Sequence, residues 1–183
     1  MTKLDATEFL DSLGCSHVVY FHDGGKTTRD VEFGFIKKGL EKQEHCFYTT
    51  QNPEEILNQM KEFGIDTEAS NEFLHVVKIP EKFEDYSKMI LGKVDELPRN
   101  SAIRVVSTHY FEFNSESKTD RMAEIEQCVE DDYHSLKGNF VCSFPVQKIT
   151  NSLRGRFLNQ LLDSHRAIIF QTEENGTEVF TLP

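Results

Sequence analysis

Short apolar runs alternate along the chain with longer stretches in which apolar residues recur every three or four positions. The short runs are rich in β-branched and aromatic residues, which is typical of strands, whereas the longer spacing is that of amphipathic helices. The predicted strands cover residues 17–21, 46–49, 73–79, 102–107, 140–144, 167–171 and 177–180. Because helix-length segments separate the first six, the pattern predicts right-handed crossovers and a mainly parallel central sheet between helical layers.

Local signals place several element boundaries. Asn52 and Pro53 predict a helix start, with Asn as the cap and Pro in the first turn, and Gly64 predicts its end. A second, strongly amphipathic helix is indicated by the regular spacing of Met122, Ile125, Val129, Tyr133 and Leu136. The last two strands are separated only by a short polar segment that contains Asn175-Gly176, which predicts an antiparallel C-terminal hairpin.

The length of the chain limits the number of domains. A chain of 183 residues fits one domain, here residues 1–183, with a core predicted over about residues 15–182. The predicted fold class is therefore an α/β three-layer sandwich. No stretch approaches the roughly 20 apolar residues of a membrane helix, and acids interrupt the N-terminal apolar residues, unlike in a secretory signal. A cytoplasmic protein without membrane contact is predicted.

Charge and cysteine content narrow the function classes. The net charge is −11, with 31 acidic against 20 basic residues, which disfavours direct binding of nucleic acid. The four cysteines form no C-x-x-C pair, so no zinc ribbon or finger is indicated. Cys46 and Cys142 lie in predicted strands and are interpreted as reduced, buried structural thiols.

The first predicted strand leads into half of a phosphate-binding loop. Gly25, Lys26 and Thr27 match the end of the G-x-x-x-x-G-K-[ST] pattern, but Tyr20 stands where the first glycine is required. The fourth strand ends in Ser107 rather than in the acid that would help hold magnesium. We therefore expect no ATP hydrolysis at this turn, although a helix N-terminus of this kind is able to bind an anion weakly.

Ligands of open α/β sheets collect beyond the carboxyl ends of the strands. Polar residues that follow four of the predicted strands, together with one aromatic ring, are the candidate ligand-binding residues. They are His22, Asp23, Gly25, Lys26, Thr27, Thr49, Thr50, His109 and Phe144.

Other reactive residues favour no catalytic site. His17 and His75 lie in apolar strands and are interpreted as structural imidazoles. A metal site built from His22 with Asp23 on one strand end and His109 on another would lack an identified third ligand. The acids at positions 130–132 fall on the polar face of their predicted helix, which indicates a solvated surface. No G-x-S-x-G elbow is present. The expectation is a protein that is not an enzyme and that has neither a catalytic residue nor a metal or cofactor.

Several segments occur in the order and spacing of a known family. A strand that begins with His17 is followed by an F-I-x-x-G-L turn at residues 35–40 and an E-x-C-x-Y strand at residues 44–48. The FVCSF strand at 140–144 and the LLDSHRAIIF segment at 161–170 come later. Over residues 17–170 the chain resembles the MEDS family, the methanogen/methylotroph sensory domain found in the DcmR regulator.

The resemblance implies a RecA-like fold of the KaiC class without an intact phosphate loop. It further implies sensing of small hydrocarbon derivatives, an archaeal or methylotroph source, and transfer of the signal to a regulatory protein. We therefore expect a non-catalytic sensor of a small, partly apolar ligand that signals to a partner protein or through a homodimer. Two alternatives stay open, namely a nucleotide-binding protein with little or no hydrolysis and an adaptor module without a ligand.

Overall fold

The computed structural model describes residues 5–24, 26–80, 85–109, 112–136, 138–172 and 176–181. Its seven-stranded sheet has the order β3-β2-β4-β5-β1-β6-β7. All neighbouring strands are parallel except for the antiparallel pair β6–β7. The strands are β1 (Ser16–His22), β2 (His45–Thr50), β3 (Leu74–Lys78), β4 (Ile103–Thr108), β5 (Gly138–Pro145), β6 (Ala167–Thr172) and β7 (Gly176–Thr181). The predicted parallel sheet and C-terminal hairpin are confirmed.

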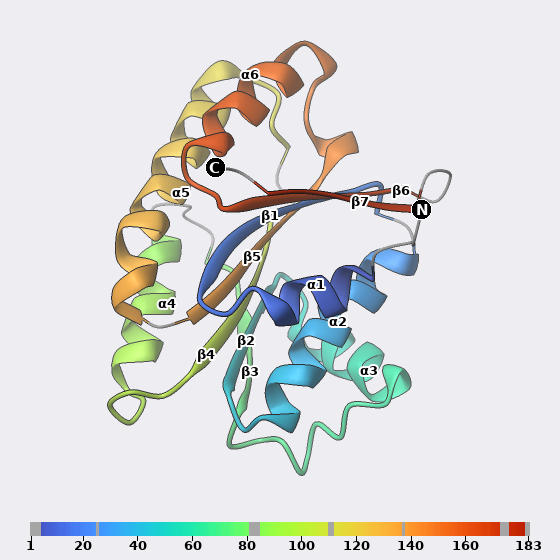
Figure 1. Cartoon of the computed structure of the whole chain (residues 1–183), viewed down its shortest axis with the longest axis vertical. Coiled ribbons are helices and arrows are strands. Elements are labelled where there is room, and N and C mark those ends of the chain that lie inside the picture. The colour runs from blue at the N-terminus through green and yellow to red at the C-terminus, as the bar shows by residue number, and fades with distance from the viewer. Residues whose placement is uncertain are drawn as a thin grey trace.

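Helices cover both faces of this sheet (Figure 1). On one face lie α1 (Ala6–Ser12), α2 (Lys26–Glu41) and α3 (Pro53–Phe63), and on the other lie α4 (Tyr86–Asp95), α5 (Glu116–Leu136) and α6 (Asn151–Leu162). A 3-10 turn, η2 (Val146–Lys148), precedes α6. The arrangement is the predicted three-layer α/β sandwich.

The alternation of side chains along the central strands builds two cores. In β1, Val18 and Tyr20 belong to the core beneath α1, α2 and α3, whereas Val19 and Phe21 belong to the core beneath α5 and α6. Every residue of β1 is buried, because the strand lies inside the sheet with a helical layer on each side. The residues of β1 that point toward α5 therefore lie in the closed interior between the sheet and the helices on that face.

The start of α3 differs in its chemistry from the sequence prediction. Asn52 occupies the N-cap of α3 with Pro53 behind it, and Gly64 ends the helix in a left-handed conformation, as predicted. However, the Asn52 side chain accepts no bond from the helix and instead donates to Glu55 at 2.8 Å. Thr27 lies inside the first turn of α2, since this helix already begins at Lys26.

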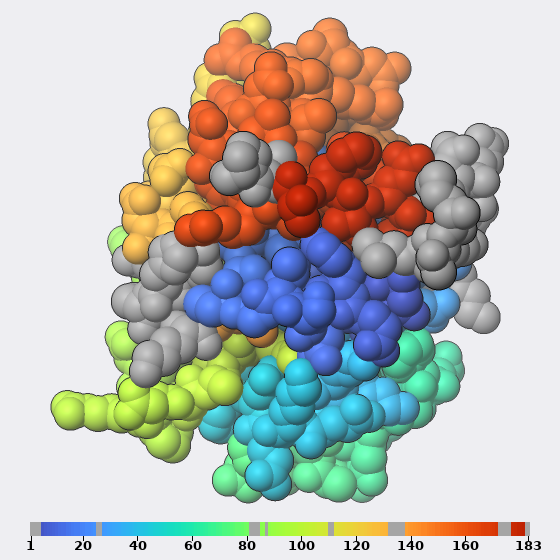
Figure 2. Space-filling model, in the orientation of Figure 1, coloured from blue at the N-terminus to red at the C-terminus, as the bar shows by residue number. Residues whose placement is uncertain are grey.

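The core begins earlier than the predicted residues 15–182. In α1, Ala6 and Leu10 are buried against the core of α2, and the Asp5 carboxylate caps the helix by accepting from two backbone N–H groups. Figure 2 shows this N-terminal segment in blue, lying between the C-terminal hairpin and α2 on one face of the molecule. Sequence patterning missed α1 because seven residues are too few to show a helical period.

No helix in the described ranges combines the length and the apolar character that a membrane crossing requires. Strands β3 and β7 form the two edges of the sheet. Among the residues that the structure describes, Phe180 on β7 is the large hydrophobic side chain that is exposed, with half of its surface accessible.

Candidate functional site

The carboxyl ends of β1, β2, β4 and β5 meet at one edge of the sheet, because these strands are parallel neighbours in the order β2-β4-β5-β1. The predicted ligand-binding residues at the strand ends are therefore brought to the same edge. Most of them are covered by the helices rather than open to solvent: His22, Thr49, Thr50, His109 and Phe144 are all buried.

The predicted residues of the half-loop are placed differently. Gly25 lies outside the described residues, and Lys26 is the first residue of α2. Asp23 is half-buried and Thr27 is exposed. Tyr20, which replaces the first glycine of the phosphate loop, points into the core and donates a 2.6 Å hydrogen bond to Gln171. A bulky, anchored side chain thus occupies a position where a phosphate loop needs bare backbone.

The two threonines that end β2 hold the sheet edge together. The Thr49 hydroxyl lies 2.9 Å from the Tyr86 hydroxyl and accepts from the Thr108 N–H at 3.0 Å. Thr50 accepts from the Asn52 N–H at 3.1 Å, which shapes the turn into α3. Their hydrogen-bonding capacity is used within the fold, and their role in binding a ligand stays a prediction.

A buried carboxylate lies behind the first turns of α2. Glu32 accepts from Arg29 at 2.7 Å, from the Tyr48 hydroxyl at 2.6 Å and from the Ser143 hydroxyl at 2.6 Å. Arg29 also contacts the Tyr48 hydroxyl. Glu32 therefore fixes the Arg29 guanidinium and compensates its charge.

An open cleft of about 570 Å³ lies between α2 and α3, beside the half-loop. Its lining combines two phenylalanine rings with polar and charged groups: Gly24, Arg29, Asp30, Phe33, Gln59, Glu62 and Phe63. The rings of Phe33 and Phe63 are in edge contact, with their centroids 5.7 Å apart. This volume and this mixture of an apolar wall with a few polar groups are typical of small-molecule sites.

A second cleft, of about 430 Å³, lies where α1, α2 and the C-terminal hairpin meet. Thr27 and Asp30 of α2 face Gln171 and Thr177 of the hairpin across it. Among the predicted ligand-binding residues, Thr27 thus lines a cleft, and Gly24, the neighbour of Asp23, lines the larger one.

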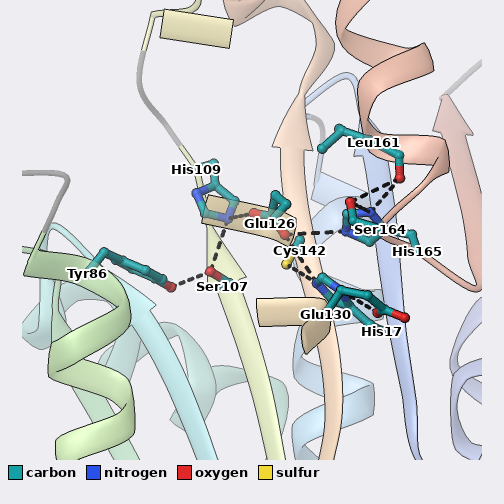
Figure 3. A network of polar contacts seen from close by, with 10 residues as sticks. All are labelled: His17, Tyr86, Ser107, His109, Glu126, Glu130, Cys142, Leu161, Ser164 and His165. Atoms are coloured by element: carbon teal, nitrogen blue, oxygen red, sulfur yellow. Dashed lines mark hydrogen bonds and ion pairs between the residues drawn. The ribbon is translucent and has the colours of Figure 1, made fainter. Parts of the chain in front are cut away.

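On the opposite face of the sheet, polar side chains converge in a buried network (Figure 3). Its centre consists of His17 on β1, Glu126 on α5, Cys142 on β5 and His165, which follows α6. All four residues are buried, and their ligand-type atoms lie within 4.8 Å of one another.

Single atoms in the centre make more than one short contact. His17 Nε2 lies 3.2 Å from Glu126 Oε2 and 3.3 Å from Cys142 Sγ. His165 Nε2 lies 3.4 Å from the same Glu126 oxygen. The other carboxylate oxygen, Oε1, lies 3.3 Å from His109 Nε2. One carboxylate therefore contacts three imidazoles.

The outer nitrogens of the two central imidazoles are also anchored. His17 Nδ1 donates to Glu130 at 3.1 Å, and His165 Nδ1 donates to the Leu161 carbonyl at 2.8 Å. A carboxylate and a carbonyl only accept, so both rings carry a proton on Nδ1. Both Nε2 atoms consequently point toward the centre.

The network extends along the sheet edge to α4. His109 Nε2 lies 3.0 Å from the Ser107 hydroxyl, which in turn contacts the Tyr86 hydroxyl. His109 also stacks on Phe144, with centroids 4.4 Å apart. Its Nδ1 is buried and has no hydrogen-bond partner among the described residues.

Burial and mutual contact perturb the acid–base properties of the centre. Burial alone would raise the pKa of Glu126, but bonds from His109, His165 and His17 hold it well below the ordinary value. Burial lowers the pKa of His165, helped by the charge of His17. For His17, burial opposes ionisation, yet contact with Glu126 and Glu130 leaves the pKa raised. Burial also raises the pKa of the Cys142 thiol well above its usual range.

These contacts correct two sequence interpretations. Glu130 does not belong to a solvated face, because it binds the buried His17, whereas its neighbour Asp131 is exposed as expected. His17 is buried as predicted, but in a cluster of four reactive side chains rather than alone. Sequence reasoning missed Glu126, although an acid one residue after Ile125 and four after Met122 falls inside the apolar stripe of α5.

No protein-family profile matches the sequence, and no curated protein matches it. Solved structures do match the chain in their fold. A KaiC-like protein, PH0186 from the hyperthermophilic archaeon Pyrococcus horikoshii OT3, has a TM-score of 0.66 at 14% sequence identity, over 92% of this chain and 80% of that chain. PH0250 from the same organism has a TM-score of 0.66 at 9% identity, over 98% and 93% of the two chains. The chain therefore has a KaiC-like, RecA-type fold.

Proposed function

We propose that this protein is a non-catalytic, cytoplasmic sensory domain that binds a small, partly apolar ligand in the cleft between α2 and α3. The observation that carries the proposal is the lining of that cleft, in which the rings of Phe33 and Phe63 adjoin Gln59, Arg29 and Glu62. Aromatic walls with a few polar groups bind organic molecules by burying apolar surface and fixing one polar end. The MEDS resemblance leads independently to a sensor of small hydrocarbon derivatives.

Charge favours a neutral or cationic ligand. Asp30 and Glu62 line the cleft, and the positive charge of Arg29 is already paired with the buried Glu32. The chain as a whole carries a net charge of −11. A polyphosphate would be repelled by these carboxylates, whereas an alkylamine or alcohol would not.

The alternative of a nucleotide-binding protein has weaker support. It rests on the KaiC-like fold and on Lys26 at the start of α2. Against it stand Tyr20 in the place of the first loop glycine and Ser107 near the end of β4, where a magnesium-binding acid is needed. The adaptor alternative needs no ligand and uses the fold as an interaction surface.

The signal would pass to a regulatory partner protein or through a homodimer. The edge strands β3 and β7 offer backbone hydrogen-bonding groups for such pairing. Phe180 on β7 adds an exposed ring at one of these edges. Binding in the α2–α3 cleft would change the packing of α3 against β3, which makes that edge responsive to the ligand.

Isothermal titration of the purified full chain tests the proposal. The titrants are small alcohols, alkylamines and quaternary ammonium ions, with MgATP and MgADP measured in parallel. We expect saturable binding of a neutral or cationic organic compound and none of the nucleotides. Tight MgATP binding without organic binding would support the nucleotide alternative, and the absence of any binding would support the adaptor.

A pair of matched variants locates the binding site. Phe63→Ala removes a half-buried ring from the cleft, and Phe73→Ala removes a half-buried ring outside it. Loss of a ring contact of about 1.5–3 kcal/mol should weaken binding about tenfold or more in Phe63→Ala. Phe73→Ala should bind as the wild type does, and equal losses in both variants would place the ligand elsewhere.

A further inference from the structure

We infer that His17, Glu126, Cys142 and His165 form a binding site for a transition-metal ion of the Zn²⁺ type. The four side chains come from four separate segments of the chain, namely β1, α5, β5 and the connection from α6 to β6. They supply two imidazole nitrogens, one carboxylate oxygen and one sulfur, which is a donor set of the kind that zinc takes in proteins. The inference does not depend on the ligand cleft, which lies on the other face of the sheet.

Three of the donor-atom separations are close to those around a tetrahedral ion, and all of them lie within 4.8 Å. Bond lengths of zinc to nitrogen, oxygen and sulfur put neighbouring ligand atoms about 3.3–3.6 Å apart. The measured separations are 3.2 Å for His17 Nε2 to Glu126 Oε2, 3.3 Å for His17 Nε2 to Cys142 Sγ and 3.4 Å for His165 Nε2 to Glu126 Oε2. All three exceed the roughly 2.7–2.9 Å of a charge-assisted hydrogen bond.

The outer contacts prepare both histidines for coordination. His17 Nδ1–H donates to Glu130 and His165 Nδ1–H donates to the Leu161 carbonyl, so Nε2 of each ring faces the centre and, once it has given up its proton, directs a lone pair at the ion. Carboxylate and backbone-carbonyl partners of this type are the usual supports of metal-ligating histidines. Glu126 Oε1, in turn, faces His109 Nε2 at 3.3 Å, which leaves Oε2 for the ion.

A divalent cation would satisfy the donor atoms of the centre together, which protons on the individual nitrogens do not. Glu126 Oε2 faces two Nε2 atoms, and the Nε2 atom of His17 also faces Cys142 Sγ. Each proton on an Nε2 atom serves one of these contacts, while a divalent ion contacts all four donors together. Nitrogen and sulfur donors exclude Mg²⁺ and Ca²⁺, which prefer oxygen.

The expected role of this ion is to fasten the helical layer to the sheet. All four ligand residues are buried, as in closed structural zinc sites, and no position is open to substrate. The ion would tie α5 and the connection after α6 to the central strands β1 and β5. Binding would therefore appear as a gain in stability.

The test uses the full chain unfolded with chelator and refolded with one equivalent of Co²⁺ or Zn²⁺. We expect retention of one ion per chain after gel filtration, visible d–d absorption of tetrahedral Co²⁺, a thiolate-to-cobalt charge-transfer band and a higher melting temperature. Wild-type protein that refolds but retains no metal, with a melting temperature unaffected by Zn²⁺, would overturn the inference.

Variants assign the ligands. Cys142→Ser should lose the charge-transfer band, whereas Cys46→Ser, the other buried thiol, should keep it. Glu130→Gln, which alters a supporting contact of His17 and leaves all four ligands in place, should fold and bind Zn²⁺ about 10–100-fold more weakly. Full charge-transfer intensity in Cys142→Ser, or wild-type affinity in Glu130→Gln, would contradict the assignment even if another variant failed to fold.

Discussion

His17 and Glu126 lie 3.2 Å apart in the interior, although 109 residues separate them in the sequence. His17 opens the first strand of the family pattern, whereas Glu126 belongs to no motif. Their contact joins the first strand, β1, to the long helix α5. The Glu126 carboxylate lies on the face of α5 that otherwise carries apolar side chains.

Replacing Glu126 with glutamine should destabilise the fold strongly. The change removes a buried charge that three imidazoles contact, and breaking such a buried network costs about 3–5 kcal/mol. Urea unfolding followed by circular dichroism measures the loss. The control is Glu124→Gln, an exposed acid on the same helix, which should change stability by less than about 0.5 kcal/mol. Equal effects of the two changes would show that the network contributes no stability.

His22 should make stability fall as the pH is lowered from 6.5 toward 4. Burial lowers its pKa from 6.5 to about 4, with Glu32, Arg29 and Asp23 as the charges acting on it. Protons therefore bind the unfolded chain first, and stability present above pH 6.5 is lost down to pH 4, by up to about 3 kcal/mol.

The measurement for His22 compares urea unfolding of the wild type and of His22→Gln across this pH range. The variant should show the smaller decrease in unfolding free energy, since glutamine does not titrate. Parallel pH profiles for the two proteins would contradict the assignment to His22.

Two glycine-to-alanine changes in helices should have opposite effects. A Cβ at Gly39 of α2 would lie 2.6 Å from Arg104 Cδ and 2.6 Å from Cys46 Sγ, so Gly39→Ala should destabilise the protein. At the exposed Gly92 of α4 nothing lies within 4 Å, and Gly92→Ala should stabilise it by up to about 1 kcal/mol through helix propensity. Thermal melting of both variants tests these two predictions. A higher melting temperature of Gly39→Ala would disprove the close packing around Gly39.

The half-loop should support no ATP turnover. Tyr20 is anchored in the core by Gln171, and Ser107 near the end of β4 contacts Tyr86 and His109 instead of holding magnesium. We expect no magnesium-dependent phosphate release from wild type, and no difference in Lys26→Ala. A robust activity that this substitution abolishes would require a nucleotide mechanism.

The sheet could be predicted from the sequence because its signals are local. Runs such as residues 17–21 and 140–144 are mainly apolar segments of strand length, and they lie within β1 and β5. The antiparallel hairpin followed from the short distance between the last two strands. The boundaries of α3 were predicted correctly at Asn52 and Gly64, but the cap bond was not, because the Asn52 side chain bonds to Glu55 instead.

The buried centre could not be predicted in the same way, because it depends on long-range packing. Cys142 and His17 were each interpreted correctly as buried, yet nothing in their spacing places them beside Glu126 or His165. Glu130 was assigned, with the two acids that follow it, to the polar face of the predicted helix, whereas in the structure its carboxylate contacts the buried His17. An acid within an apolar helical stripe was the available signal.

Native mass spectrometry of the protein as purified tests the central claim most directly, because it reports bound molecules and assembly size in one spectrum. The proposed sensory function predicts a folded chain that carries a small organic ligand and that keeps this ligand when MgATP is added. A spectrum dominated by a chain bound to ATP or ADP, with magnesium, would contradict it.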